Sequence, residues 1–530
     1  MRWPCYFDAA TKRWDVQIQF SSRHIPRFAR ANICKVHGTM IWMRSWLNFR
    51  SEEHAMIYRA GRILLTLALA MVASGSARAQ APMAKPDLSK LADEAQGWLS
   101  DLVRINSVNP PGNEAVVAKY ISAIFQKEGI SNEVLEMAPG RSIVIARIQA
   151  SPLPDPTNAL LILAHQDTVG VDTKKWTVDP FAATIRDGYM YGRGSIDDKA
   201  MLAANIATMV EIKRTNAHIA RDVIFLATDD EEQGGAASIK VTIQKYWDKI
   251  ACAYSLNEGG RVMVKDGKVQ YVGVQASEKV AYNVVVTATG SSGHGSLPKP
   301  DNAVVHLSAA IEKLGTYQVP AQPSTITLRY FDQLAKVEDD EIAKWMRALE
   351  QPGRADLAVK HLSDESPMWN SMLRDTIAPT MLQAGVRVNV VPSEATANLN
   401  IRMLPGHSIE ELMGQFAKIV NDPQIKFQLA PDSGENAPPS DLTTPLYKTI
   451  ERLTPQEFPG AITVPILGTG ATDSASLRLH KVQAYGLEPF PLIESDGSRV
   501  HADDERIPVD SFHKGVVFLY HVVSEFASTK

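Results

Sequence analysis

The sequence predicts an α/β protein in which a doubly wound sheet is interrupted by a smaller α+β domain. Between residues 142 and 257, short apolar runs alternate with amphipathic stretches, as expected when helices cover both faces of a mostly parallel sheet. Between residues 280 and 429 the order becomes strand–helix–strand–strand–helix–strand, which is typical of a small ferredoxin-like domain. Helix and strand patterns that suit the first domain return after Pro439.

Apolar periodicity predicts the elements of the larger domain in order. Helical periodicity runs over 91–129 and is broken at 109–113, where two prolines and a glycine occur. A helix is expected at 199–214, because Met201 and Leu202 recur with later apolar residues on one face. The other elements expected in this domain are strands at 142–149, 159–164, 223–228, 250–257 and 484–486, and helices at 236–246, 446–453 and 510–527.

The smaller domain is predicted from strands of alternating and β-branched residues. Its elements are expected to be strands at 280–289, 380–391, 394–403 and 425–429, and helices at 302–317 and 408–420. Residues 336–375 are charged and helical, and we interpret them as an insertion within this domain. The predicted boundaries are therefore 86–276 and 432–530 for the two parts of the larger domain, with the inserted domain at 277–431.

The N-terminal region predicts export from the cytoplasm. Residues 56–79 contain a short basic segment, an apolar stretch from Ile63 to Val72 and an A-x-A site ending at Ala79, in the order of a secretory signal peptide. A lone buried or interfacial helix is the alternative interpretation of the apolar stretch. Because signal peptides begin a chain, residues 1–55 are a doubtful upstream segment, and we expect translation to start at Met56. The mature protein would then be secreted or periplasmic.

Composition restricts the possible partners. The 530 residues are 45% hydrophobic and 22% charged with a net charge of −4, so nothing indicates a nucleic-acid partner. No apolar run reaches the roughly 18 residues of a membrane-spanning helix, so we expect no membrane association of the mature form. Beyond the N-terminal region the single cysteine is Cys252, which lies in an apolar run and is expected in the core.

Acidic residues and histidines follow several predicted strands. Strand 159–164 is followed by His165 and Asp167, which point to one side of an extended segment because they are two residues apart. Carboxylates and imidazoles gathered at strand ends of an open α/β sheet are what a metal site requires, and they indicate a hydrolase. The remaining members of this set are Asp197, Asp198, Glu231, Glu232, Glu258 and His501.

Each of these residues, taken singly, also has a structural interpretation. His165 alone is equally compatible with a hydrogen-bonded structural histidine. One of Asp197 and Asp198 is expected to cap the helix that follows. The four acids at 229–232 could form a solvated surface, but they follow a buried strand and precede two glycines, which argues against that. Adjacent carboxylates that enter a pocket repel each other unless a cation is present, and a carboxylate bridging two metals would remove that cost.

Jointly, the set offers imidazole nitrogens and several carboxylate oxygens. Such a mixed nitrogen and oxygen set suits zinc, with cobalt or manganese as alternatives. The adjacent Glu231 and Glu232 could divide two roles between them, one binding metal and the other acting on water as a general base.

Four motifs together resemble those of the di-zinc peptidase family that includes aminoacylase, carboxypeptidase G, carnosine dipeptidase and succinyl-diaminopimelate desuccinylase. The resemblance covers roughly residues 88–527, and the stretch from His165 to Lys199 looks most like the carboxypeptidase S branch. The motifs match in order and spacing: H-x-D at 165–167, G-R-G-x-x-D-x-K at 192–199, D-E-E at 230–232 and E-G-G at 258–260.

The resemblance implies a role for each residue of the set. One zinc ion would be held by His165, Asp197 and Glu258, and the other by Asp197, Glu232 and His501, so that Asp197 bridges them. Asp167 would orient His165, and a cis peptide is expected between Asp197 and Asp198. Glu231 would be the general base that takes a proton from the attacking water and passes it to the leaving amine.

The resemblance extends to the inserted domain, which would be a lid through which the protein forms a homodimer. His294 would polarise the scissile carbonyl, often in the active site of the partner subunit, and Asn389 would contact substrate. Arg402 would grip a terminal carboxylate through its two-pronged guanidinium. Gly470 and Thr472 match a substrate-binding loop, in which Ala471 replaces a common glycine.

These observations predict a secreted di-zinc metallopeptidase, either a carboxypeptidase or a dipeptidase, that cleaves an amide bond next to a free carboxylate. An N-acyl-amino-acid deacylase is the alternative, because it uses the same chemistry on a different acyl group. A non-catalytic binding protein on this scaffold would normally have lost a metal ligand or the base, and this sequence keeps them all.

Overall fold

The computed structural model describes residues 86–529, except 152–155, 236–237, 432–433 and 435, together with four strands between residues 5 and 42. The chain divides into two units, Met1–Ala81 and Pro82–Lys530. In the first unit, consecutive strands pair in an antiparallel sheet: β1 (Cys5–Asp8), β2 (Arg13–Ile18), β3 (Ala29–Val36) and β4 (Thr39–Trp42). The predicted signal peptide at 56–79 lies outside the described residues. Everything below concerns the second unit.

Among the described residues, the larger domain is built on a ten-stranded sheet of order β22-β12-β13-β21-β11-β7-β10-β6-β5, with β20 paired to β13. The centre is parallel, because β7 (Leu160–His165) lies between β10 (Val223–Thr228) and β11 (Tyr254–Asn257), and β21 (Gln483–Gly486) follows β11. The flanking strands are β5 (Asn132–Ala138), β6 (Arg141–Ile148), β12 (Arg261–Lys265), β13 (Lys268–Glu278), β20 (Ile462–Gly468) and β22 (Pro491–Leu492).

Two hydrophobic cores lie on the two faces of this sheet. Successive strand residues point to opposite faces, so Leu160 and Ile162 join one core while Leu161 and Leu163 join the other. The first core is covered by α2 (Leu88–Arg104), α3 (Glu114–Lys127), α4 (Lys199–Arg214) and α15 (Val509–Ser528). The second is covered by α5 (Ile239–Ile250) and α13 (Ser474–Leu479). This is the predicted doubly wound arrangement.

The smaller domain has the predicted ferredoxin-like order. Its sheet runs β16-β18-β14-β19, and burial alternates along β14, which turns one face of the sheet toward the helices. Helix α11 begins at the cap Ser408, whose hydroxyl accepts from the amide of Glu411, and ends at Asn421 in the left-handed region. The elements are β14 (Val280–Thr289), α6 (Ala303–Thr316), β16 (Thr376–Ala384), β18 (Glu394–Met403), α11 (Ile409–Val420) and β19 (Ile425–Leu429).

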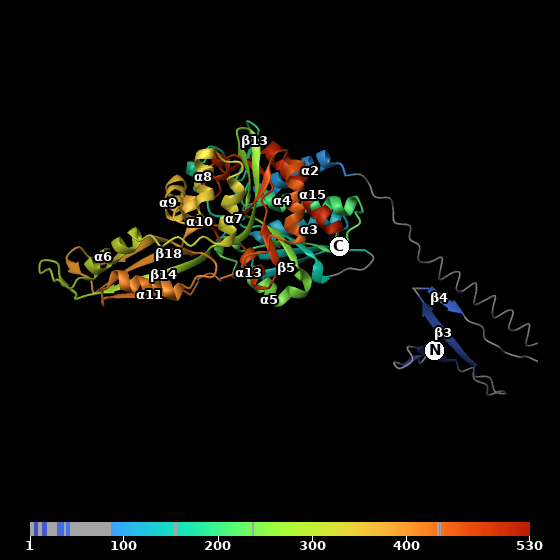
Figure 1. Cartoon of the computed structure of the whole chain (residues 1–530), viewed down its shortest axis with the longest axis horizontal. Coiled ribbons are helices and arrows are strands. Elements are labelled where there is room, and N and C mark those ends of the chain that lie inside the picture. The colour runs from blue at the N-terminus through green and yellow to red at the C-terminus, as the bar shows by residue number, and fades with distance from the viewer. Residues whose placement is uncertain are drawn as a thin grey trace, which may run out of the picture. The chain divides into compact units, whose positions relative to one another are not determined.

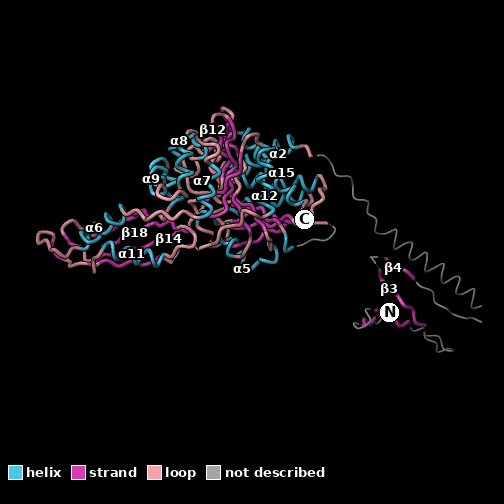
Figure 2. Tube along the Cα trace, in the orientation of Figure 1, coloured by secondary structure: helices cyan, strands magenta, loops and turns pink. Residues whose placement is uncertain are grey.

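The segment 277–431, assigned to the inserted domain from sequence, does not pack as one body. Four helices within it join the core of the larger domain, where Tyr330 and Phe331 are buried beside β20. Figures 1 and 2 show α7, α8 and α9 on one side of the β12–β13 strands and α2 and α15 on the other. The interpretation of 336–375 as an insertion in the small domain was therefore wrong. These helices are α7 (Thr325–Leu334), α8 (Asp340–Ala348), α9 (Ala355–Glu365) and α10 (Pro367–Leu373).

Three strand predictions also need correction. The apolar run 250–257 forms a strand only from Tyr254, because Ile250 still belongs to α5. The strand predicted at 380–391 begins earlier and ends at Ala384, because Gly385 has a φ of +69° that turns the chain. The third correction is an omission: no strand was predicted at 462–468, where β20 pairs with β13 and contains Pro465.

The remaining elements complete the larger domain. Helix α12 (Pro445–Glu457) packs on α15, and strands β8 (Thr184–Arg186), β9 (Tyr189–Tyr191) and β23 (Arg506–Pro508) form a small separate sheet. Short elements include α14 (Glu494–Gly497) in the larger domain and, next to the strands of the smaller domain, the pair β15 (Gly293–His294) and β17 (Val390–Val391). In the part of the chain that the structure describes, no helix is both long and apolar enough to cross a membrane.

Candidate metal centre

Parallel strands bring the acidic residues to one edge of the large sheet. His165 ends β7 and lies opposite Thr228 at the end of β10, so the segments after these strands start side by side. Glu231 and Glu232 form a 3₁₀ turn just after β10, and Glu258 directly follows β11. Ligand sites of open α/β sheets lie at such carboxyl ends.

Asp197 lies between two histidines that are far apart in the sequence. Its Oδ1 lies 2.9 Å from Nε2 of His165, and its Oδ2 lies 3.1 Å from Nε2 of His501. Nε2 of His165 is also 3.6 Å from Oε2 of Glu258, and Nε2 of His501 is 3.2 Å from Oε2 of Glu232. The five side chains therefore lie close together around Asp197. Potential ligand atoms of His165, Glu231 and Glu258 lie within 4.8 Å of one another, as do those of His165, Asp197 and Glu232, so Glu231 lies within reach of the same cluster.

The donor set fits divalent cations. Oε1 of Glu232 and Oε1 of Glu258 are buried and have no hydrogen-bond partner. Burial raises the pKa of Glu231 well above its usual range, and the neighbouring Glu258 carboxylate raises it further. Several buried carboxylates in one place are costly unless cations compensate their charge. The oxygen and imidazole donors suit zinc, cobalt or manganese.

The same crowding affects the histidines. Hydrogen bonds to Asp197 and Glu232 raise the pKa of His501 to about 10. Burial opposes protonation of His165, but hydrogen bonds to Asp167, Asp197 and Glu258 outweigh burial and raise its pKa. The neighbouring carboxylates thus favour the positively charged form of both imidazoles. Metal ions bound at this cluster would compensate the carboxylates instead of protons and would bind the imidazoles in their neutral form.

Asp167 connects the end of β7 to the turn that carries both glutamates. Its Oδ1 lies 3.3 Å from Nδ1 of His165, the ring nitrogen that faces away from Asp197. The Asp167 carboxylate also accepts hydrogen bonds from the Asn109 side chain at 2.8 Å and from the amides of Glu231 at 3.3 Å and Glu232 at 3.2 Å. A carboxylate behind a ligand histidine fixes the orientation of the ring and its tautomer.

A buried ion pair fixes the loop that carries Asp197. Glu505 accepts hydrogen bonds from the backbone amides of this loop, at 2.8 Å from Ile196 and 3.2 Å from Asp197, and pairs with Arg193 at 2.5 Å. Arg193 in turn donates to the carbonyl of His501 at 3.2 Å. The loops that carry Asp197 and His501 are thereby joined by one buried, charge-assisted network.

The Asp197–Asp198 peptide is cis, as the resemblance implied. Asp198 occupies the N-cap position of α4, but its side chain makes no capping hydrogen bond there. Its Oδ2 instead accepts from the backbone amide of His165 at 3.2 Å, which holds the start of α4 against the end of β7.

Next to the metal candidates is a cavity of about 420 Å³, which we call the carboxylate cavity. It is lined by Glu231, Glu232 and His501 from the larger domain and by Arg402 from β18 of the smaller one. The Nε of Arg402 donates to the Asn400 side chain at 3.2 Å. Among the described residues, the side-chain hydrogen bond of Arg402 goes to this amide rather than to a carboxylate, and burial lowers the pKa of Arg402. The guanidinium therefore offers free donors to an anion close to Glu231.

Gly470 and Thr472 also line the carboxylate cavity, but the backbone of Gly470 is open whereas the polar groups of Thr472 are already hydrogen-bonded. Apart from its own chain neighbours, no atom lies within 4 Å of the position that a Cβ would take at Gly470, so the backbone there is open to a ligand. The amide and hydroxyl of Thr472 donate to Glu278 at 3.0 and 2.9 Å. Glu278 is itself paired with Arg478 at 2.7 Å, so Thr472 holds the loop in place.

His294 and Asn389 lie together but outside the carboxylate cavity. The amide of Gly295 donates to the carbonyl of Asn389 at 2.8 Å, which holds the two segments of the β15–β17 pair together. The His294 ring is exposed and lies 2.7 Å from the Ser296 hydroxyl. The structure thus gathers the five metal candidates with Glu231, Asp167, Arg402, Gly470 and Thr472, and leaves His294 and Asn389 apart from them.

Residues 161–525 match the peptidase family M20/M25/M40, which is more than half of the chain. The chain belongs to this family. Among curated proteins, human N-fatty-acyl-amino acid synthase/hydrolase PM20D1 is 27% identical over 77% of this chain and 82% of its own length. The probable carboxypeptidase S-like 2 of Dictyostelium discoideum is 27% identical over 70% of this chain and 72% of its own length.

Solved structures of the M20 family share the fold. The metallo-carboxypeptidase Sso-CP2 of Sulfolobus solfataricus superposes with a TM-score of 0.63 at 18% identity, covering 82% of this chain and 99% of its own. Human carnosine dipeptidase 1 gives a TM-score of 0.60 at 16% identity, covering 84% of this chain and 100% of its own. The family resemblance and the α/β fold with an inserted α+β domain are confirmed, and this M20 protein is a hydrolase of the metallo-exopeptidase type.

Sequence reasoning missed several residues that support the site of this M20 protein. Asn109 holds Asp167, and its position beside two prolines gave no sign of that role. Arg193 is part of the G-R-G motif and Glu505 follows His501 by four residues, yet their pairing across the chain appears only in the fold. Asp473 is buried next to the turn of Glu231, and burial raises its pKa to about 7.

Proposed function

We propose that the protein hydrolyses an amide bond whose leaving amine belongs to an amino acid with a free carboxylate. The observation that carries the proposal is Arg402, which has no carboxylate partner among the described residues and lines one cavity with Glu231 and His501. An anionic group bound by the Arg402 fork would hold the neighbouring amide beside the metal candidates.

Two divalent cations, proposed to be zinc with cobalt or manganese as alternatives, would be held by His165, Asp197 and Glu258 and by Asp197, Glu232 and His501. When bound, such ions polarise an amide carbonyl and lower the pKa of water. Glu231 serves as the general base: it takes the proton of the attacking water and returns it to the leaving amine. Asp167 keeps His165 in one tautomer, and Arg402 positions the substrate.

The acyl side of the substrate distinguishes two candidate functions. A peptide as acyl group would make the protein a carboxypeptidase or a dipeptidase, as the carboxypeptidase S-like relative suggests. A fatty-acyl group would make it an N-acyl-amino-acid hydrolase, as the name of the PM20D1 relative suggests. Both reactions use the same carboxylate clamp and the same base.

A substrate panel tests the proposed function. Dipeptides, longer peptides and N-acyl amino acids would each be assayed with zinc, beside the same compounds with the terminal carboxylate amidated. We expect hydrolysis of the free acids and kcat/KM values lower by at least tenfold for the amides. Equal hydrolysis of acids and amides would contradict the role of Arg402, and hydrolysis of neither would contradict the proposed reaction.

We further propose that the protein is a homodimer through the small domain. Strand β16 lies at the edge of its sheet and exposes Met381 and Leu382, and Val386 and Val388 are exposed just beyond it. An exposed apolar edge strand favours pairing with a second copy. Light scattering should give the mass of a dimer for the wild type and of a monomer for Leu382→Lys; a monomeric wild type would contradict this.

Export remains a proposal that rests on the pattern of residues 56–79. The mass of the protein recovered from its native cells should correspond to a chain that begins at Gln80. A mature chain that retains residues 1–55 would contradict both the cleavage site and the proposed start at Met56.

A further inference from the structure

Lys279 is a buried lysine at the point where the chain passes from the large sheet into the small domain. Strand β13 ends at Glu278 and strand β14 begins at Val280, so Lys279 lies between the two sheets. The residue is only 1% exposed. An ammonium group is costly to bury unless its three N–H donors are hydrogen-bonded, so the partners of Lys279 indicate what the residue does.

The Nζ of Lys279 has acceptors on both sides of the boundary between the domains. In helix α10, which packs in the core of the larger domain, it lies 2.9 Å from the carbonyl oxygen of Ser371 and 3.2 Å from its hydroxyl. Where the chain enters β16 of the smaller domain, it lies 2.9 Å from the carbonyl oxygen of Arg374 and 3.1 Å from the hydroxyl of Thr376. Lys279 therefore holds two connections between the domains together, and we call this set of contacts the Lys279 junction.

The Lys279 junction lies beside Arg402 in the sheet of the small domain. Thr376 is the direct partner of Arg402 in the antiparallel pair of β16 and β18. On the other side of β18, Arg402 is the partner of Ala281, two residues after Lys279. Directly opposite residues of an antiparallel pair have their Cβ atoms close together. Arg402 is thus flanked by the two strand ends that the Lys279 ammonium group joins.

Asp375 attaches the end of β18 to the same junction. Its Oδ1 accepts a hydrogen bond from the amide of Leu404 at 2.6 Å, and its Oδ2 lies 2.8 Å from Nδ1 of His407. Leu404 directly follows β18, and Arg402 is two residues earlier. The strand that carries Arg402 is therefore fixed both by its neighbouring strands and at its end.

The residues at this domain boundary also hold the opposite wall of the carboxylate cavity. The amide of Lys279 donates to the carbonyl of Gly468 at 2.9 Å, and the Glu278 carboxylate accepts from the amide and hydroxyl of Thr472. Thr472 and Arg402 both line the carboxylate cavity. Two adjacent residues, Glu278 and Lys279, thereby set the position of one loop and one strand that face each other across the cavity.

Lys279 itself also lines the carboxylate cavity, which raises the alternative that its ammonium group binds the substrate carboxylate directly. Its contacts argue against this alternative, because four protein oxygens already surround a group with three N–H donors. A residue whose donors are taken up by the protein acts on the substrate through the groups that it holds.

We propose that Lys279 is a positioning residue that holds Arg402 at the carboxylate cavity and so sets the preference for substrates with a free carboxylate. This inference rests on the proposed function, which supplies the reaction and the role of Arg402. It adds a residue that does not contact the substrate and a connection between the domain boundary and specificity.

The experiment compares kcat/KM for a free acid and for its amide, and we call the quotient the acid-to-amide ratio. The substrates are alanyl-alanine, trialanine and N-decanoyl-alanine, each beside its C-terminal amide. Lys279→Met removes the donors and should lower the ratio by about tenfold, because a small displacement of a positioning group has a large effect on rate. The change should come from a higher KM for the acids, with kcat/KM for the amides unchanged.

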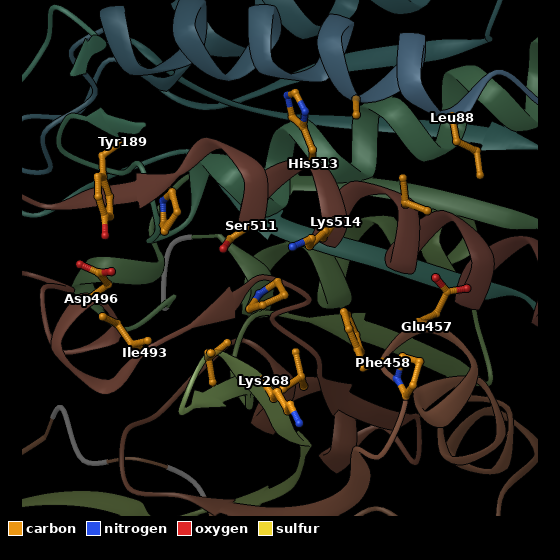
Figure 3. Close-up of a pocket in the computed structure, with 18 of the residues that line it drawn as sticks. Leu88, Tyr189, Lys268, Glu457, Phe458, Ile493, Asp496, Ser511, His513 and Lys514 are labelled. Carbon is orange, nitrogen blue, oxygen red and sulfur yellow. The ribbon is translucent and has the colours of Figure 1, made fainter. Parts of the chain in front are cut away.

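Lys268→Met is the matched control, because Lys268 begins the strand that Glu278 ends. Lys268 is exposed and lines a cavity of about 770 Å³ between α2, α15 and the β12–β13 turn, and no member of the metal cluster lines that cavity (Figure 3). The acid-to-amide ratio of Lys268→Met should equal that of the wild type.

A double variant separates positioning from direct binding. If Lys279 acts through Arg402, Lys279→Met combined with Arg402→Ala should have the same acid-to-amide ratio as Arg402→Ala alone. Should Lys279→Met fail to fold in a thermal unfolding test, Thr376→Val removes only the hydroxyl beside Arg402. That variant should lower the ratio by roughly threefold, as expected for the loss of one hydrogen bond.

Three outcomes overturn the inference. An acid-to-amide ratio that is unchanged in folded Lys279→Met, or in Thr376→Val where that variant takes its place, shows that the junction does not position Arg402. An equal loss of kcat/KM for acids and amides shows a structural role only. A ratio that falls further in the double variant than in Arg402→Ala shows that Lys279 acts independently of Arg402. In each case the wild type still prefers free acids, so the proposed function stands; a wild type without that preference would remove the proposed function itself.

Discussion

The large sheet and the small domain place their candidate functional residues in opposite environments. At the edge of the large sheet, His165 is 1% exposed and is held by Asp167, Asp197 and Glu258. In the small domain, His294 is exposed and has a neighbouring serine as its side-chain contact. The candidate metal ligands are thus held in position by neighbouring side chains of the protein, whereas the His294 ring is held only by the adjacent Ser296 segment.

Arg402 is intermediate between these environments and shows how the two regions work together. It lies on β18 of the small domain but lines the carboxylate cavity beside Glu231 of the large one. Under the proposed function, the large sheet would supply the groups for the reaction, and the small domain would supply the group that recognises the carboxylate. The predictions that follow test this division.

The largest effect is expected at the general base. Glu231→Gln should lower kcat by roughly 10²–10⁴-fold, the range associated with general acid–base catalysis, without changing the number of metal ions bound. Glu341→Gln, on the exposed surface of α8, is the matched control and should leave kcat unchanged. Steady-state kinetics and metal analysis of both variants test this. Substantial activity in Glu231→Gln, or loss of metal, would make Glu231 something other than the base.

The next effect concerns the buried pair behind the metal site. Arg193→Met should lower the unfolding free energy by about 3–5 kcal/mol, because it leaves the Glu505 carboxylate buried without its cation. The exposed pair of Arg329 and Asp332, at 2.9 Å, is the control, and Arg329→Met should change stability by less than about 1 kcal/mol. Denaturant unfolding measures both. Equal losses of unfolding free energy in Arg193→Met and Arg329→Met would show that the pair of Arg193 and Glu505 does not organise the site at the large sheet.

A moderate effect is expected on the recognition side. Arg402→Ala should raise KM for substrates with a free carboxylate by about 10- to 100-fold, since a hydrogen bond to a charged group contributes about 1.5–3 kcal/mol. The amidated analogues should be unaffected, because they do not use the guanidinium. Arg387→Ala, exposed in the same domain, serves as the control. A fall in kcat with unchanged KM would place Arg402 in the reaction and would remove the division between the two regions.

The smallest effect is a pH dependence of stability in the large domain. Burial raises the pKa of Glu114 to about 7 although Arg141 lies nearby. Because the pKa of Glu114 is higher in the folded than in the unfolded protein, its protonation contributes to the free energy of unfolding. That contribution is fully present below about pH 4.5 and is lost as the pH rises through about 7. The free energy of unfolding of the wild type should therefore fall, relative to that of Glu114→Gln, as the pH rises over this range. A difference that is constant with pH would contradict the prediction.

Sequence reasoning succeeded where local pattern and fold agree. Apolar and β-branched runs predicted β10, β14, β18 and β19 with the bounds observed, and helix α4 likewise, because burial and periodicity point to the same answer there. The metal candidates were predicted from acids and histidines that follow buried strands, and the structure places these side chains within a few ångströms of one another. The pattern did not predict β20, a seven-residue strand that contains Pro465.

Long-range pairings could not be predicted from the sequence. Nothing in the local pattern of α7 to α10 says that Tyr330 and Phe331 pack on the large sheet rather than on the domain that surrounds them in sequence. The pairing of Arg193 with Glu505 likewise depends on two loops meeting in space.

The number of divalent metal ions per chain tests the central claim, that Asp197 joins two metal sites at the edge of the large sheet. Elemental analysis of the protein after dialysis against zinc should give two ions per chain for the wild type. His501→Ala should reduce that number, and Asp197→Ala should reduce it further. A wild-type chain that binds no metal and hydrolyses its substrates equally well after chelation would contradict the account.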